Sequence, residues 1–121
     1  MTKRILVVED TADNREIIRD MLDAAGYAMI EAVNGAQGVR LAESEKPDLI
    51  LMDMQMPEID GYEATRQIKA VPALAHIPII AVTSYALAGD EAKTRAAGCD
   101  DYVAKPFSPR LLMQKIRTHI G

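Results

Sequence analysis

Short apolar runs alternate along the chain with longer segments of helical spacing, and this alternation is the feature that most constrains the fold. The runs ILVV at 5–8, LILM at 49–52 and IPIIAV at 77–82 are continuously apolar rather than apolar at every second position. Strands of this kind are typical of a parallel sheet with helices on both faces. Two further runs, 30–33 and 102–104, complete a set of five predicted strands.

The segments between the strands are predicted helices. The first is expected to end at Gly26, because glycine tolerates the left-handed conformation that often closes a helix. Its apolar face consists of Ile17, Ile18, Met21, Leu22 and Ala25. Three more helices are predicted over 36–44, 62–69 and 90–97, and the last segment places apolar residues at steps of four, at Leu112, Ile116 and Ile120.

Five strands alternating with five helices predict an α/β fold, a doubly wound five-stranded parallel sheet of the (βα)5 flavodoxin-like type. The expected strand order is 2-1-3-4-5, which makes the first, third and fourth strands neighbours. A length of 121 residues suits one compact core. We therefore expect a single domain over 1–121.

The charge balance excludes some classes of partner. The chain has 14 Lys and Arg against 18 Asp and Glu, a formal net charge of -4, so it lacks the basic excess that favours nucleic acid or an anionic membrane. No apolar run approaches the roughly 20 residues that span a bilayer, and the start of the chain has no signal-peptide pattern. A cytoplasmic location is the expectation. Cys99, the one cysteine, is interpreted as core filling, and His76 and His119 as surface or cap residues.

Polar residues follow four of the five predicted strands. Glu9 and Asp10 follow the first strand, Asp53 the third, Thr83 the fourth and Lys105 the fifth. In a doubly wound sheet a site forms outside the carboxyl ends of the strands. Three carboxylates there need a counter-charge, and Mg²⁺ suits a site with few carboxylate ligands and room for a phosphate oxygen.

Each of these residues also has an ordinary structural explanation. Glu9 and Asp10 suit the start of a helix, Asp53 and Lys105 suit a solvated strand end, and Thr83 is a common strand residue. Coincidence is the weaker explanation of the whole set, because these residues end four different strands on one edge with complementary charges.

The order Glu9-Asp10, Asp53 within LILMDMQMPEIDG, Thr83-Ser84, Tyr102 and Lys105-Pro106 resembles the receiver domain of two-component response regulators. The resemblance covers the chain from Lys3 to its end and is specific, because it fixes several separated positions at once. Within the family, the stretch LAHIPIIAVTSYALAGDEAKTRAAGCDDYVAKPFSP is similar both to stand-alone receivers of the DivK type and to receivers of hybrid sensor kinases.

The resemblance implies that Asp53 is the phosphoacceptor. It implies that Asp10, Asp53 and the backbone carbonyl of Gln55 bind Mg²⁺ directly, with Glu9 acting through water and Mn²⁺ as an expected substitute. Lys105, Thr83 and the Ser84 N–H would contact the phosphoryl group.

The resemblance also implies a switch. Thr83 would move toward the phosphoryl group and Tyr102 would then turn inward, which changes the surface formed by the fourth helix, the fifth strand and the fifth helix. Pro106 would follow a cis peptide, and Gly61 is expected to permit the turn at the end of the loop that follows Asp53. Tyr85, by its size, is hypothesised to shield the phosphoryl group from water.

The implied partners are a histidine kinase, a histidine phosphotransfer protein or both, together with a downstream protein target that is needed because no output module follows Gly121. The chain is expected to be a signalling switch, not an enzyme acting on other molecules. Two alternatives stay open at this point: an intermediate phosphorelay carrier, and a receiver taken from a hybrid histidine kinase.

Three rival classes fit the residues less well. A flavin-binding electron carrier needs a phosphate cradle after the first strand, where this chain has EDTADN. An aspartyl phosphohydrolase usually needs a second Asp two residues after the nucleophile, where this chain has Gln55. A degenerate receiver would lack one of the acids or the lysine, and all are present.

Overall fold

The computed structural model describes residues 2–84, 88–106 and 108–121. Within them, strands and helices alternate in the order β1 (Arg4–Val8), α1 (Ala12–Ala25), β2 (Ala28–Ala32), α2 (Gly35–Glu45), β3 (Leu49–Asp53), α3 (Gly61–Lys69), β4 (Ile79–Thr83), α4 (Ala88–Ala96), β5 (Asp101–Ala104) and α5 (Pro109–Ile120). All strand pairs are parallel, and the sheet order β2-β1-β3-β4-β5 confirms the predicted topology.

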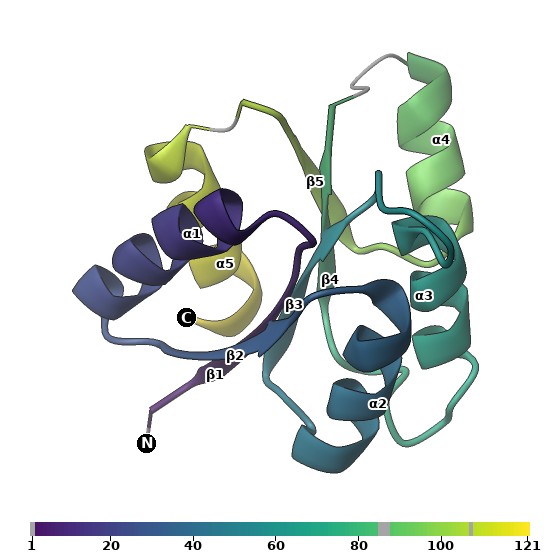
Figure 1. Cartoon of the computed structure of the whole chain (residues 1–121), viewed down its shortest axis with the longest axis horizontal. Helices are drawn as coiled ribbons and strands as arrows, with labels where there is room; N and C mark the ends of the chain where they lie inside the picture. Colours follow the sequence, from purple (N-terminus) through teal and green to yellow (C-terminus); the bar gives the residue numbers. More distant parts are fainter. Residues whose placement is uncertain (1, 85–87, 107) are drawn as a thin grey trace.

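The sheet separates two hydrophobic cores. Figure 1 shows α1 and α5 on one face and α2, α3 and α4 on the other. Alternate residues of β1 enter opposite cores: Ile5 and Val7 pack toward α1 and α5, whereas Leu6 and Val8 pack on the other side. This explains why the central strands are apolar at consecutive positions, since both faces are buried. The carboxyl ends of β1, β3, β4 and β5 point toward the top of Figure 1, where the site lies.

Two glycines shape the chain near these elements. Gly26 closes α1 with φ 85, the left-handed conformation predicted for it. Gly61 is the first residue of α3 and follows directly on the loop after Asp53. A Cβ on Gly61 would lie 2.3 Å from the carbonyl oxygen of Asp53, so glycine lets α3 begin directly against the end of β3.

The predicted range of β2 was wrong by one to two residues. The strand begins at Ala28 and ends at Ala32 rather than spanning 30–33. Val33 leaves the sheet because its N–H donates to the Gln37 side chain, while Asn34 caps α2 by accepting from the Gln37 N–H. This reciprocal capping explains why Val33 is 44% exposed.

Two residues of the predicted apolar face were also misplaced. Ala25, the last residue of α1, is exposed. Ile17 is 51% exposed, whereas Ile18 and Leu22 are buried under α1. Consecutive residues lie about 100° apart around a helix, so Ile17 falls beyond the edge of the stripe centred on Ile18 and Leu22. The apolar face of α1 is therefore narrower than the sequence pattern indicates.

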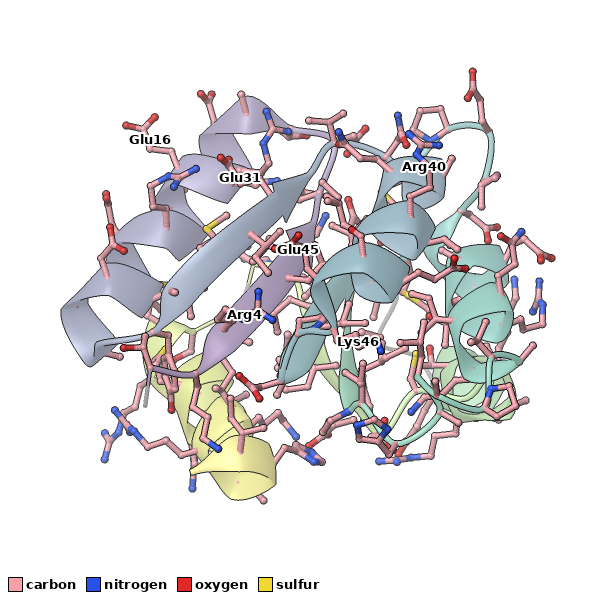
Figure 2. The ribbon with its side chains drawn as sticks, turned by 90° about the horizontal axis from the view of Figure 1, so that it is seen from below. Arg4, Glu16, Glu31, Arg40, Glu45 and Lys46 are labelled. Carbon is pink, nitrogen blue, oxygen red and sulfur yellow. The ribbon has the colours of Figure 1, made fainter. Side chains whose placement is uncertain are left out.

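Charged side chains lie at the edge of the sheet formed by β2, where Glu31 pairs with Arg15 and Arg19 of α1. Such charges discourage another chain from adding to an edge strand. A further ion pair joins Arg4 of β1 to Glu45 at the end of α2. Figure 2 shows Arg4 and Glu45 side by side. Among the described helices, none has the length and apolar character needed to cross a membrane.

Candidate functional site

Three carboxylates meet at the ends of β1 and β3. The two strands are neighbours with Val8 opposite Met52, so the residues that follow lie side by side. One oxygen from each of Glu9, Asp10 and Asp53 falls within 4.8 Å of the others. Glu9 and Asp53 are both 3% exposed, whereas Asp10 is open to solvent. Two buried negative groups at such a distance repel each other unless a cation compensates them.

Lys105 supplies part of that compensation. Its Nζ lies 3.0 Å from Asp53 Oδ1 and 3.7 Å from Glu9 Oε1. The backbone of Lys105 is held in place because its main-chain N–H donates to the Thr83 carbonyl at 2.7 Å. This bond continues the pairing of β4 with β5. The following bond to Pro106 is cis, as the family resemblance implied.

Lys105 does not fully compensate the negative charges of Glu9 and Asp53. Burial, hydrogen bonding with Asp53 and repulsion by the Asp53 charge raise the pKa of Glu9 to about 7, against the opposing effects of Asn14 and Lys105.

The donor set fits a hard divalent cation. Glu9 Oε2 is buried and has no hydrogen-bond partner among the described residues, which leaves an oxygen available for a water or a cation. The three clustered carboxylates offer the oxygen ligands that Mg²⁺ prefers. A bound divalent cation would favour ionised Glu9 and so complete the charge compensation.

Gln55 spans the site from the loop after β3. Its N–H donates to Asp53 Oδ1 at 3.0 Å, its Nε2 donates to Thr83 Oγ1 at 2.9 Å, and its Oε1 accepts from the Ser84 N–H at 2.8 Å. Thr83 is 1% exposed at the end of β4. The Gln55 side chain therefore links the loop that follows β3 to the end of β4.

The structure brings together most of the residues that the sequence singles out: Glu9, Asp10, Asp53, Gln55, Thr83, Ser84 and Lys105. Tyr102 is half-buried on β5 and packs against the core on the α4 side. Tyr85 lies outside the described residues.

Cys99 is buried as predicted, and His76 is exposed. His119 has a partner that the sequence did not indicate, because its Nε2 lies 3.3 Å from Asp101 Oδ2.

Two contacts of Glu9 were missed at the sequence level. Asn14 Nδ2 donates to Glu9 Oε1 at 2.6 Å, and Arg15 Nη1 donates to the Glu9 backbone carbonyl at 2.8 Å. Both residues lie in the first turns of α1: Asn14 is the last residue of EDTADN, and Arg15 follows it. Their place just after the acidic pair was the available signal.

A pocket opens beside the cluster. It is lined by Lys105 and Ser84 together with Asn14, Ile17, Pro106 and Pro109. Lys105 is therefore accessible from the face of the sheet that α1 and α5 cover.

Comparison with known proteins places this geometry in a family. The family model for the response regulator receiver domain matches residues 5–117. The polar-differentiation response regulator DivK of Brucella anthropi is 42% identical over 121 residues, which covers 100% of this chain and 98% of DivK. DivK of Brucella ovis is also 42% identical over the same length.

Solved structures agree with this assignment. The receiver domain of the sensor histidine kinase PA1611 from Pseudomonas aeruginosa, which has a magnesium ion coordinated in its active-site cleft, matches with a TM-score of 0.92 and 42% identity over 100% of this chain and 99% of that one. The chemotaxis protein CheY4 of Vibrio cholerae has a TM-score of 0.93 at 23% identity over 99% of this chain and 100% of that one, and supports the fold. The chain therefore belongs to the response regulator receiver domain family, the signalling switches of two-component systems.

Proposed function

We propose that Asp53 accepts a phosphoryl group and that the phosphorylated chain signals through contact with another protein. The observation that carries the proposal is the setting of Asp53. Its carboxylate is 3% exposed, lies 3.0 Å from Lys105 Nζ and belongs to the same cluster as Glu9 and Asp10. A carboxylate nucleophile beside a fixed cation suits phosphoryl transfer, in which catalysis consists mainly of positioning and charge neutralisation.

Mg²⁺ is the proposed cofactor, and Mn²⁺ the proposed substitute, since both prefer oxygen ligands. Asp10, Asp53 and the backbone carbonyl of Gln55 would hold the cation, with Glu9 acting through water. When bound, the cation neutralises charge on the phosphoryl oxygens. The unpartnered Glu9 Oε2 supports a polar occupant at this position.

In the proposed reaction, an oxygen of Asp53 attacks the phosphorus of a phosphohistidine. The new O–P bond forms as the N–P bond breaks, and the imidazole nitrogen leaves with the electron pair. Lys105 stays beside the acceptor and pairs with a phosphoryl oxygen, while Thr83 and the Ser84 N–H donate to the others. The pocket that Asn14 and Pro109 help to line beside Lys105 gives the donor access.

The phosphoryl group adds about -1.5 to -2 charge, and Thr83 and Tyr102 are proposed to carry the resulting change to the α4, β5 and α5 surface. The anchoring of α4 suits a movable element. Among its side chains at 91–96, Thr94 alone is buried, and Thr94 Oγ1 finds no hydrogen-bond partner among the described residues. An element with little buried apolar surface moves at low cost.

A glutamine at position 55 is evidence against a phosphohydrolase function. An acid/base residue two positions after the nucleophile must donate and accept protons. The Gln55 amide is neutral, and both of its polar atoms are engaged, with Thr83 and with the Ser84 N–H. The function supported best is thus a switch that modifies only itself, with a histidine kinase or phosphotransfer protein as donor and a protein as downstream target.

Incubation with acetyl phosphate and Mg²⁺, followed by intact mass measurement, tests the proposal. We expect wild type to gain one phosphoryl group and Asp53→Asn to gain none, because the amide is a poor nucleophile. Glu63→Gln, an exposed acid on α3, is the matched control and should react like wild type. A wild-type protein that stays unmodified would refute the proposal.

A further inference from the structure

We infer that the side chain of Gln55 is an internal competitor of the phosphoryl group: it occupies the Ser84 N–H before phosphorylation and must release it for the phosphoryl group to bind. The inference rests on the proposed function, because it takes this N–H as a phosphoryl contact. It makes Gln55 a positioning residue whose side chain sets how readily Asp53 is modified.

The orientation of the amide follows from its partners. A backbone N–H can only donate, so the Gln55 atom that lies 2.8 Å from the Ser84 nitrogen must be the oxygen. The amide nitrogen then faces Thr83 Oγ1 at 2.9 Å. Both ends of one planar group are therefore matched, acceptor to donor and donor to acceptor.

The Ser84 bond makes the competition exclusive. The Ser84 nitrogen carries one hydrogen, which already points at Gln55 Oε1. A phosphoryl oxygen that accepts this hydrogen displaces the amide oxygen, because one N–H makes one well-aligned hydrogen bond. In the unphosphorylated chain, the amide oxygen thus serves in place of the phosphoryl oxygen.

The backbone of Gln55 plays a separate part. Its N–H donates to Asp53 Oδ1 at 3.0 Å, which holds the main chain beside the acceptor. Release then requires only rotation of the side chain out of the site.

Beryllofluoride, a non-covalent mimic of the phosphoryl group, measures the competition directly as a dissociation constant in the presence of Mg²⁺. Gln55→Met keeps the bulk of the side chain and loses both hydrogen bonds, and Gln55→Ala also removes the bulk. We expect both variants to bind beryllofluoride about fivefold more tightly than wild type, since the hydrogen bond of about 1 kcal/mol between the Ser84 N–H and the amide no longer opposes binding. Gln67→Met, at an exposed position of α3 where the amide bonds Glu63, should bind like wild type.

A second readout needs no phosphoryl mimic. In the ligand-free protein, hydrogen exchange at the Ser84 amide should quicken in Gln55→Met and stay unchanged in Gln67→Met. Unchanged or weaker beryllofluoride binding by both Gln55 variants would overturn the inference. Tighter binding by Gln55→Ala alone would also overturn it, because bulk and not hydrogen bonding would then be the obstacle. Wild type that neither binds beryllofluoride nor reacts with acetyl phosphate would instead refute the proposed function.

Discussion

At Asp53, one lysine lies beside two buried carboxylates, and the exposed Asp10 completes the acidic cluster. Lys105 approaches Asp53 more closely than Glu9, at 3.0 Å against 3.7 Å, so Glu9 is the less compensated acid. Its pKa, raised to about 7 by burial and by Asp53, reflects this. The site is therefore arranged to gain from a second positive charge.

Addition of Mg²⁺ should stabilise the folded protein. A ligand that binds only the folded state adds about 1.4 kcal/mol at ten times its dissociation constant, so wild type should melt at a higher temperature in Mg²⁺ than in EDTA. Asp10→Asn and Asp53→Asn remove proposed ligands and should show a smaller rise. Asp20→Asn, exposed on α1, should behave like wild type, and an equal rise in all four proteins would argue against this cation site.

The residues of the site could be predicted to different degrees. Glu9, Asp53 and Lys105 could be found because parallel strands end at one edge of a sheet and the family resemblance fixes the positions. The contacts of Asn14 and of the Gln55 side chain could not, because a polar side chain has several rotamers and its choice depends on neighbours distant in sequence.

Among the elements, the junction of β3 with α3 constrains the site most. The first turn of α3 packs against the end of β3 at Gly61, where a side chain would contact the backbone of Asp53 and Met54. Asp60 caps the same helix by accepting from the Glu63 N–H. The loop between the two elements is thus held at both ends, which keeps Gln55 over the site.

Gly61→Ala should disturb both stability and function. The new Cβ would meet the Asp53 carbonyl at 2.3 Å, and overpacking of this kind costs about 1–3 kcal/mol. We expect a lower free energy of unfolding in urea and slower uptake of phosphoryl from acetyl phosphate.

Gly26→Ala is the control for that experiment. Gly26 has φ 85 and open space around it, so alanine should cost about 1 kcal/mol through the backbone alone. Its rate of phosphoryl uptake should match wild type. Equal slowing in both variants would mean that stability, and not the β3–α3 contact, governs the rate.

The elements themselves were largely predictable, and the errors have local causes. The β3 and β4 runs are apolar on both faces, and this feature identified them as strands. Ala28 and Met29 carry no β-branched signal, so the start of β2 was missed. Its end was overextended because Val33 has a strand-like side chain yet takes part in the α2 cap.

At the scale of the whole molecule, the two ends of the sheet have different roles. The carboxyl ends hold the charged cluster, whereas the start of β5 ties the sheet to α5. There, Asp101 accepts from Lys115 Nζ at 2.8 Å and lies 3.3 Å from His119 Nε2. Strand order and topology followed from the alternation of elements and the family resemblance, but this junction depends on side chains and was not foreseen.

Asp101 should make stability depend on pH in the acid range. Burial acts to raise the pKa of Asp101, but hydrogen bonds from Lys115, the Tyr102 N–H and His119 outweigh it and lower the pKa. A carboxyl with a lowered folded-state pKa contributes stability above its unfolded value, about 3.9, and loses it as the pH falls through the folded value.

Urea unfolding of wild type and Asp101→Asn from pH 7 to pH 2 measures this contribution. We expect a stability difference that stays constant down to about pH 5 and shrinks below about pH 4. Lys115→Met removes the donor at 2.8 Å and should reduce the same acid-range dependence. A difference that grows as the pH falls would contradict the assignment.

The central claim is that the phosphoryl group resides on Asp53, and borohydride trapping tests it most directly. Borohydride reduces an acyl phosphate to an alcohol, so an aspartyl phosphate becomes homoserine, which peptide mass mapping locates. After reaction with acetyl phosphate and Mg²⁺, the account predicts homoserine at position 53 and at no other aspartate. Homoserine at position 10 would contradict the claim. So would a protein that has gained a phosphoryl group and yields no homoserine.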